Sequence, residues 1–100
     1  MAAYVIVNVN VADPVRYEDY KRMVPPSLAA YGGRFAVRGG QVEVREGSWR
    51  PRRLVILEFP SAAQARAWYD SPEYAEAKKL RHATSTADLI IVEGMETATG

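Results

Sequence analysis

The stretch Leu54–Gln64, LVILEFPSAAQ, carries the strongest strand signal in the chain, followed at once by the start of a helix. Leu54–Phe59 is a run of aliphatic and aromatic residues of the kind that favours a strand. Ser61 and Gln64 then stand three residues apart, the spacing of a capping box in which each side chain satisfies a backbone donor of the other residue. The stretch therefore predicts a strand that ends at Phe59 and a helix that opens at Ser61.

The residues after this stretch predict two helical segments and a strand. The helix that opens at Ser61 is expected to bury three side chains: Ala65, Trp68 and Tyr69. Ser71-Pro72-Glu73 restarts a second helical segment that runs to about His82. Asp88–Glu93 is the last predicted strand.

The residues before it predict a strand and a helix. Ala3–Val11 is rich in β-branched residues, and Asp13-Pro14 supplies an N-cap and a proline for the first helical turn. Pro25-Pro26 must kink or restart this helix, because an interior proline loses a hydrogen bond. Gly32-Gly33 is expected to end it, with Gly33 in or beside a left-handed C-cap. Apolar residues recur at helical spacing between these limits: Tyr17, Tyr20, Val24, Leu28 and Tyr31.

Two short alternating runs, Arg34–Arg38 and Gln41–Arg45, lie on either side of Gly39-Gly40. They form either a tight hairpin or one long strand bent at a glycine bulge, and we favour the bent strand. Glycine pairs beside arginines also suggest a phosphate-binding loop. Such a loop lies between a strand and the start of a helix, and neither glycine pair precedes a helix, so the phosphate-loop interpretation fails.

The predicted order is strand, helix, strand, strand, helix, strand, which is the order of the ferredoxin-like fold in the α+β class. It places both helices on one face of an antiparallel sheet. Because alternate strand residues face opposite sides, the all-apolar sets are assigned to the helices. The second face then carries aliphatic and polar side chains together: Tyr4, Ile6, Asn8, Asn10, Arg34, Arg38, Leu54, Ile56 and Glu58.

That second face is too apolar to be left open to water, since large exposed apolar patches mark interaction sites. A second copy of the chain is the simplest cover, because two-fold dimers dominate among oligomers. We therefore expect a homodimer with Tyr4, Ile6, Leu54 and Ile56 turned inward.

Composition sets further limits. The chain has 100 residues, of which 48% are hydrophobic, and a formal net charge of +1, which gives no general attraction to nucleic acid or an anionic membrane. The absence of cysteine excludes disulfides, thiol catalysis and thiolate zinc sites. No basic leader and no apolar run of ~20 residues is present, so we expect a cytoplasmic protein without membrane contact. We expect one domain over residues 1–96 and a frayed tail over residues 97–100.

Five segments resemble, in this order, a small bacterial family known as domain of unknown function 1330: AYVIVNVNVADPVRYEDY, AYGGRFAVRGGQVEV, RRLVILEFPS, ARAWYDSPEY and IIVEG. They span nearly the whole chain. The resemblance implies a dimeric α+β barrel, in which two sheets face each other around an internal space, and no established reaction or cofactor. Relatives in the same superfamily include cofactor-independent monooxygenases, haem-handling enzymes and amino-acid-sensing domains, and these stand as analogies.

The polar residues of the second face are the candidate site. Tyr4, Asn8, Asn10, Arg34, Arg38 and Glu58 are suited to lining a pocket for a small organic anion between the two sheets. The alternative is that they satisfy one another, above all as an Arg38–Glu58 pair. An enzyme of monooxygenase-like or isomerase-like type would use Glu58 as proton acceptor and Arg38 or Arg34 to hold charge. A structural or regulatory dimer without turnover is the third interpretation.

Other conspicuous residues have simpler explanations. His82, the single histidine, is expected to be solvated near a helix end, and no metal site is expected. Arg50, Arg52 and Arg53 read as a solvated loop. Trp68, Tyr69 and Tyr74 read as core. RNA recognition on this fold needs sheet aromatics for base stacking, and Leu54 and Ile56 at those positions have no π-face, so nucleic acid is not an expected partner.

Overall fold

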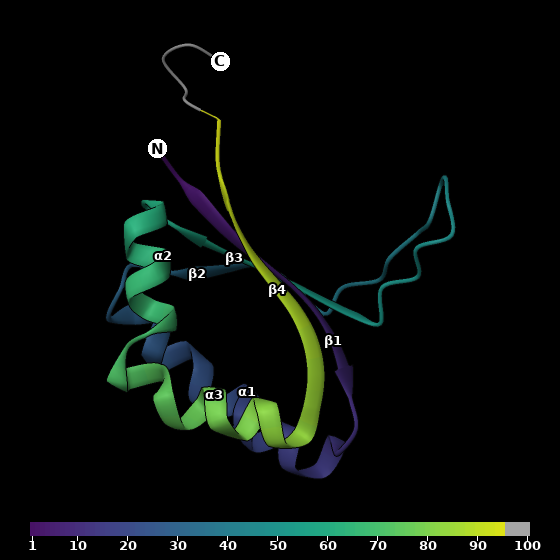
Figure 1. Cartoon of the computed structure of the whole chain (residues 1–100), viewed down its shortest axis with the longest axis horizontal. Coiled ribbons are helices and arrows are strands. Elements are labelled where there is room, and N and C mark those ends of the chain that lie inside the picture. The colour runs from purple at the N-terminus through teal and green to yellow at the C-terminus, as the bar shows by residue number, and fades with distance from the viewer. Residues whose placement is uncertain (96–100) are drawn as a thin grey trace.

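The structure, a computed structural model, describes residues 1–95. It contains β1 (Ala3–Val11), α1 (Pro14–Ala29), β2 (Arg34–Arg38), β3 (Arg53–Phe59), α2 (Ala62–Tyr69), α3 (Pro72–Thr84) and β4 (Ser85–Glu93). The four strands form one antiparallel sheet in the order β2-β3-β1-β4. Figure 1 shows the three helices on one side of this sheet. The predicted α+β, ferredoxin-like arrangement is confirmed; the predicted tail, residues 97–100, lies outside the described residues.

Side-chain oxygens cap the start of each helix, as the sequence predicts. The Asp13 carboxylate accepts a hydrogen bond from the Arg16 amide (3.1 Å), and the Ser71 hydroxyl accepts one from the Tyr74 amide (3.1 Å). The Ser61 hydroxyl likewise accepts from the Gln64 amide (3.2 Å). The Gln64 side chain donates to the Tyr31 carbonyl (3.2 Å) and accepts from the Ser61 hydroxyl (3.3 Å), and it does not accept from the Ser61 amide, so only half of the predicted capping box forms.

Helix α1 runs through its prolines and ends as predicted. It continues through Pro25 and Pro26 as one helix, so of the two predicted alternatives, a kink or a restart, the restart does not occur. Gly32 has a φ of +72°, and the Gly33 amide donates to the Leu28 carbonyl (3.0 Å), so the glycine pair ends the helix in the left-handed region as predicted.

The predicted long bent strand is wrong, because β2 stops at Arg38. Gly39 has a φ of +70° and turns the chain, while its amide donates to the Leu54 carbonyl (2.9 Å). Residues 39–52, named here the arm, contain no strand and stand away from the helices and the sheet (Figure 1). The bulge lies within β2 instead, where Phe35 pairs with Leu57 and Val37 pairs with Ile56, so that Ala36 is the extra residue.

The last strand begins earlier than predicted. Helix α3 runs to Thr84 and β4 starts directly at Ser85, three residues before Asp88. The Thr84 carbonyl accepts from the Ala12 amide (2.8 Å), which ties the end of α3 to the end of β1. The pairing of Ser85 with Val11 then extends the sheet.

The two faces of the sheet differ as strand parity predicts. The covered face, turned to the helices, includes Val5, Val7, Val9, Leu57 and Phe59, all of them buried. The helices contribute the rest of the core, including Tyr17, Val24, Leu28, Trp68 and Tyr74. The open face carries Tyr4, Ile6, Leu54 and Ile56, which are only partly buried, and Ile90 and Val92, which are exposed. Burial on the covered face supplies the main stabilising free energy of the fold.

Candidate functional site

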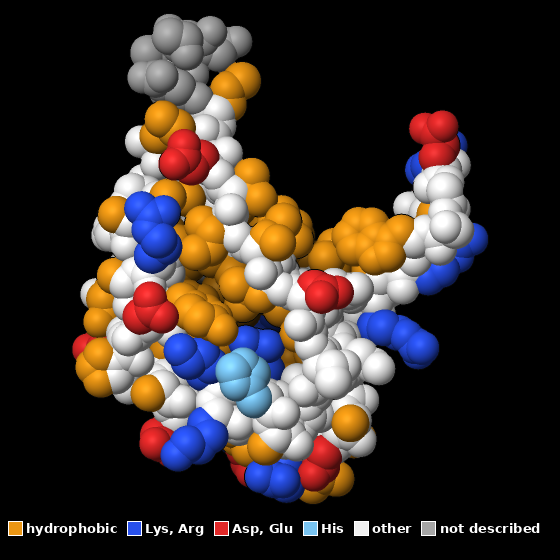
Figure 2. All heavy atoms as spheres, in the orientation of Figure 1, with side chains coloured by type: hydrophobic (Ala, Val, Ile, Leu, Met, Phe, Trp, Pro, Cys, Tyr) orange, Lys and Arg blue, Asp and Glu red, His pale blue; other side chains and the backbone are white. Residues whose placement is uncertain are grey.

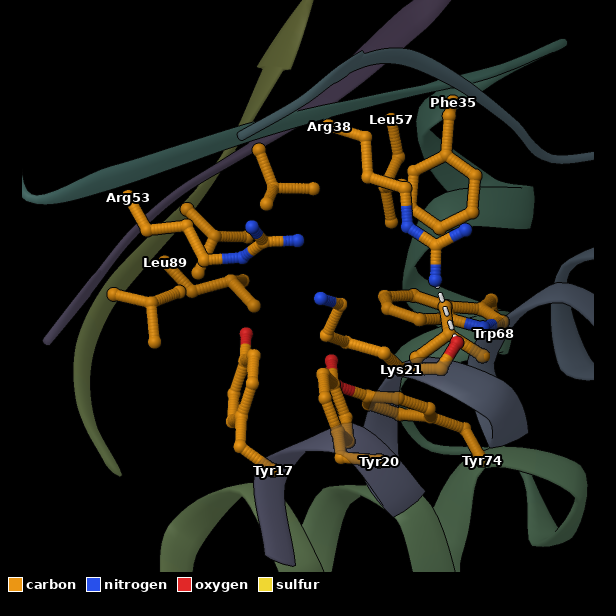
Figure 3. Close-up of a pocket in the computed structure, with 14 residues that line it drawn as sticks. Tyr17, Tyr20, Lys21, Phe35, Arg38, Arg53, Leu57, Trp68, Tyr74 and Leu89 are labelled. Atoms are coloured by element: carbon orange, nitrogen blue, oxygen red, sulfur yellow. Dashed lines mark hydrogen bonds between the residues drawn. The ribbon is translucent and has the colours of Figure 1, made fainter. Parts of the chain in front are cut away.

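A pocket lies within the single chain, between the covered face of the sheet and the helices α1, α2 and α3 (Figure 3). Its free space measures about 20 Å³, room for a water-sized molecule. We call it the inner pocket; it is lined by Val7, Val9, Tyr17, Tyr20, Lys21, Val24, Phe35, Arg38, Arg53, Val55, Leu57, Trp68, Tyr74 and Leu89. The lining joins aliphatic and aromatic side chains to three cations and contains no carboxylate.

Arg38 reaches this pocket because of the bulge at Ala36. The extra residue shifts the alternation of β2, so that Arg38 pairs with Val55, a covered-face position. Its guanidinium donates to the Lys21 carbonyl on α1 (2.6 Å) and lies 4.2 Å from the centroid of the Phe35 ring. Arg38 is thereby held over the mouth of the inner pocket (Figure 3).

Arg53, the first residue of β3, is the second cation from the sheet. It pairs with Val9 and therefore points to the covered face, where Figure 3 shows it reaching into the pocket above Tyr17. Its guanidinium carbon lies 5.8 Å from the centroid of the Tyr17 ring. Its Nε atom is buried and has no hydrogen-bond partner among the described residues. A buried donor without an acceptor is costly, which makes Arg53 Nε a natural contact for a bound acceptor.

Lys21, Arg38 and Arg53 also line a shallow hollow outside the inner pocket, together with Glu18, Arg22 and Pro25. The three cations therefore stand between the inner pocket and solvent. Lys21 is paired with Glu18 (3.2 Å) on the outer side. None of the ion pairs within residues 1–95 includes Arg38 or Arg53. The mouth of the pocket thus carries positive charge that the described residues leave uncompensated.

Aromatic hydroxyls form the floor of the pocket. The Tyr20 and Tyr74 hydroxyls are hydrogen-bonded to each other (2.9 Å), and the Tyr74 ring stacks on the Trp68 ring with centroids 4.1 Å apart. Burial raises the pKa of Tyr20 far above its ordinary value, with the Tyr74 hydroxyl adding to the effect. Burial also raises the pKa of Tyr17, although Arg53 opposes it. Both tyrosines are therefore neutral hydrogen-bonding groups at neutral pH.

The Arg38–Glu58 pair, which the sequence analysis left open as the alternative to a ligand site, does not form, since the two side chains lie on opposite faces of the sheet. Glu58 pairs in register with Arg34 on the open face, and the two side chains form a hydrogen-bonded ion pair there. The prediction assumed a regular strand from Arg34 to Arg38, and the bulge at Ala36 reverses the facing of every residue after it. Arg34, rather than Arg38, satisfies Glu58.

The remaining predicted residues stay on the open face, away from the inner pocket. The Asn8 side-chain oxygen accepts a hydrogen bond from the Arg52 amide (3.0 Å) and so fixes the start of β3. Asn10 is exposed, and Tyr4 stands opposite Glu58 in the register. The structure thus brings Tyr4, Arg34 and Glu58 together and separates them from Arg38.

Sequence reasoning missed Lys21, Arg53 and the pocket role of Tyr17 and Tyr20. A signal for Arg53 was present, because it alternates with Val55 and Leu57 and therefore shares their face. Starting the strand at Leu54 left Arg53 in the loop. Lys21 follows Tyr20 on α1, a position that helical periodicity assigns to the edge of the buried stripe.

Groups for metal binding or membrane insertion are not found in residues 1–95. No cluster of three or more His, Asp or Glu side chains there is arranged to hold a metal ion. No helix in the same residues combines the length and the apolar character needed to cross a membrane. His82 is exposed on the last turns of α3, as expected.

The described architecture is that of an α+β protein with the ferredoxin-like fold and a pocket between sheet and helices. Residues 2–95 match the sequence family described as a domain of unknown function (DUF1330). The chain belongs to this family. A comparison with curated proteins gives no significant match.

Solved structures of the same fold include proteins with and without a stated activity. A protein of unknown function from Rhodopseudomonas palustris is 21% identical with a TM-score of 0.76, over 95% of this chain and 83% of that one. SnoaB, a cofactor-independent oxygenase from Streptomyces nogalater, is 13% identical with a TM-score of 0.64, over 96% of this chain and 95% of its own. A dimeric protein of unknown function and ferredoxin-like fold from Bacteroides fragilis is 14% identical with a TM-score of 0.59, over 93% and 96%. At these identities the likeness is one of fold.

Proposed function

We propose that the protein binds a small organic anion in the inner pocket. The observation that carries this proposal is that Arg38 and Arg53 converge with Lys21 on one apolar and aromatic pocket while neither arginine has a carboxylate partner among residues 1–95. Arg38 is exposed at the mouth, but Arg53 is partly buried, and buried charges are normally paired. A guanidinium holds a carboxylate in two parallel hydrogen bonds. The unbonded Nε of Arg53 adds a donor for the same ligand.

The pocket walls favour a ligand with a flat apolar body. Phe35 and Trp68 supply aromatic surface, and Tyr17 and Tyr20 supply hydroxyl groups for a second polar atom of the ligand. The free space is water-sized, so a ligand of this kind must displace the ends of Lys21, Arg38 and Arg53. These are long, flexible side chains at the mouth, and their displacement leaves the core packing intact.

Binding is a better-supported function than catalysis. The lining residues of the inner pocket include no histidine, aspartate or glutamate to act as a general base. The raised pKa values of Tyr17 and Tyr20 keep both hydroxyls protonated at neutral pH. The catalytic pair suggested by the sequence, Glu58 with Arg38, is divided between the two faces of the sheet.

We further propose that the protein is a homodimer joined through the open face. Its apolar side chains Ile6, Leu54, Ile56, Ile90 and Val92 form a continuous patch across three strands. The arm leaves 41% of Val42 and 62% of Trp49 exposed. A second copy covers both features at once, and a two-fold arrangement does so symmetrically.

A thermal-shift comparison tests the ligand assignment. Benzoate is expected to raise the melting temperature, and benzamide, its neutral isostere, is expected to leave it unchanged. At a benzoate concentration ten times Kd the stabilisation is roughly 1.4 kcal/mol. Arg38→Ala should reduce this effect, while the control Arg45→Ala, an exposed arginine of the arm, should keep it in full. The assignment is wrong if no carboxylate raises the melting temperature, or if Arg38→Ala leaves the rise unchanged.

A further inference from the structure

A second concave surface lies on the other side of the core, between α2, α3 and the edge strand β4. We call it the groove; it measures about 790 Å³ and is lined by Tyr69, Arg81, His82, Ser85, Thr86, Ala87, Leu89 and Ile91. Figure 2 shows it as a hollow with hydrophobic side chains above and the pale-blue histidine at its lower rim. We propose that the groove is a second, separate binding site, for a carboxylate carried on an apolar body, in which Arg81 holds the carboxylate.

Arg81 is a buried cation without a counter-ion. Only 4% of the Arg81 surface is exposed, yet none of the ion pairs within the described part of the chain includes Arg81. Its Nε donates to the Tyr74 hydroxyl (3.3 Å), and one terminal nitrogen lies 3.5 Å from His82 Nε2. A guanidinium has five N–H donors, so these two contacts leave donors and a full charge facing the groove. Burying an unpaired charge is costly, and a carboxylate in the groove relieves that cost.

The opposite wall of the groove is apolar. Leu89 and Ile91 pair with Val7 and Val5, so they point to the same side of the sheet as the core. Because β4 is an edge strand, both side chains remain partly exposed beside Tyr69. An arginine facing aliphatic and aromatic walls suits an acid with an apolar body better than an inorganic anion.

The groove is distinct from the inner pocket. Tyr74 stands between them, because its hydroxyl contacts Arg81 on the groove side and Tyr20 on the pocket side. Leu89 lines both spaces and forms the other part of the partition. Arg38 and Arg53, the cations of the inner pocket, do not line the groove. The two proposed sites can therefore be tested independently.

His82 offers a direct readout of the groove. It is the single histidine of the chain, so its ring resonances are unambiguous in a proton NMR spectrum. Partial burial lowers its pKa below 6.5, and the positive charges of Arg81 and Lys78 lower it further. An anion seated on Arg81 brings a negative charge beside the ring and raises that pKa.

The experiment is a pH titration of the His82 ring by NMR with and without a probe. Benzoate is expected to raise the pKa of His82, and benzamide at the same concentration is expected to leave it unchanged. The proposal is overturned if benzoate leaves the pKa of His82 unchanged. Inorganic phosphate is a third arm: a rise equal to that given by benzoate would overturn the assignment of an apolar ligand body.

Two alanine-to-glutamate substitutions distinguish the effect of a carboxylate in the groove from the effect of an added negative charge elsewhere. Ala87 is exposed, lines the groove and faces the helices, so Ala87→Glu supplies a tethered carboxylate. This variant should have a raised pKa of His82 without any probe and should lose the benzoate response. Ala75→Glu adds the same charge on an exposed position of α3 outside the groove and should behave like the parent. Equal behaviour of the two variants would overturn the proposal.

Arg81→Lys tests the guanidinium itself, and the Ala87 variant remains informative if this buried substitution unfolds the chain. The lysine variant should lose most of the benzoate effect on His82, because an ammonium cannot make two parallel hydrogen bonds. The same benzoate series in Arg38→Ala distinguishes the sites. A His82 response that persists there supports the groove, whether or not the inner pocket binds; a response that disappears shows that His82 reports the inner pocket and overturns the groove.

Discussion

The two faces of the sheet are built from alternate residues of the same strands, yet they end in opposite environments. On the covered face, Val5, Leu57 and Phe59 are almost completely buried under the helices. On the open face, Ile90 is 54% exposed, although its neighbours across the strands are also aliphatic. The comparison teaches that the chain contains apolar residues for two interfaces and that its own helices cover one of them.

The two arginines of β2 show that one residue decides which face of the sheet a side chain occupies. Arg34 lies before the bulge and pairs with Glu58 on the open face, while Arg38 lies after it and reaches α1 on the covered face. A single extra residue, Ala36, separates an exposed ion pair from an unpaired cation over a pocket. The bulge is thus the feature that creates the candidate site.

The largest expected effect comes from the core between the covered face and the helices. Trp68 is fully buried, stacks on Tyr74 and donates from its ring nitrogen to the Ser27 hydroxyl (3.0 Å). Trp68→Ala should lower the free energy of unfolding by about 3–5 kcal/mol at every protein concentration. Urea titration measures it. Trp49→Ala, on the exposed arm, is the control; equal losses in the two variants at low protein concentration would contradict the assignment of the core.

A substitution on the open face should change the oligomeric state of the protein. Ile56→Arg places an unpaired charge in the proposed dimer interface and should cost several kcal/mol of association free energy. Light scattering coupled to gel filtration should show the parent as a dimer and the variant as monomer or precipitate. Val15→Arg, on an 80% exposed position of α1, should leave the dimer intact. A soluble, dimeric Ile56→Arg protein would rule out association through this face.

A smaller effect is expected where β2 ends. Gly39 has a positive φ, and a side chain there would clash with the Arg53 guanidinium. Gly39→Ala should therefore cost about 1–2 kcal/mol of stability and weaken the benzoate response by displacing Arg53. Gly40→Ala is the matched control, because a side chain at Gly40 meets nothing closer than Val37 Cγ1 at 3.9 Å. Thermal denaturation with and without benzoate measures both; similar losses for the two variants would refute the special role of Gly39.

The smallest effect concerns pH. Burial, with Tyr74 adding to it, raises the pKa of Tyr20 above 10.0 in the folded state. Above that pH the unfolded chain loses a proton that the folded chain keeps, so the stability is fully present below pH 10 and falls as the pH rises. Tyr20→Phe should flatten the decline of stability above about pH 10. Parallel declines in parent and variant would show that Tyr20 does not contribute.

Local signals in the sequence were sufficient for the fold. The caps at Asp13, Ser61 and Ser71 and the turn at Gly32-Gly33 all form, and periodicity identified both faces of β1 and β3. The prediction of a long bent strand failed because the alternating pattern in Gln41–Arg45 forms a strand only where a partner strand is available. Among residues 1–95 the arm has no such partner strand.

The candidate site was predicted less well. The sequence identified Arg38 as a residue for an organic anion. The assumed alternation of side chains through Ala36 placed Arg38 on the wrong face of the sheet, because the bulge shifts that alternation. No residue pattern in the sequence marks a bulge at this alanine. Arg53 and Lys21 were missed because each lies at the edge of a regular pattern. The meeting of α1 with β2 and β3 is a tertiary event, so the pocket that they form has no local signature.

The most direct test of the central claim compares Arg34 and Arg38, two arginines on one short strand. Isothermal titration calorimetry should measure benzoate binding to the parent, Arg34→Ala and Arg38→Ala proteins, all three also carrying Ala87→Glu so that the groove does not bind the benzoate. If the anion binds on the covered face, Arg38→Ala loses at least tenfold in affinity, the equivalent of about 1.4 kcal/mol, while Arg34→Ala stays close to the parent. Loss of binding in Arg34→Ala with retention in Arg38→Ala would place the ligand on the open face and contradict the account.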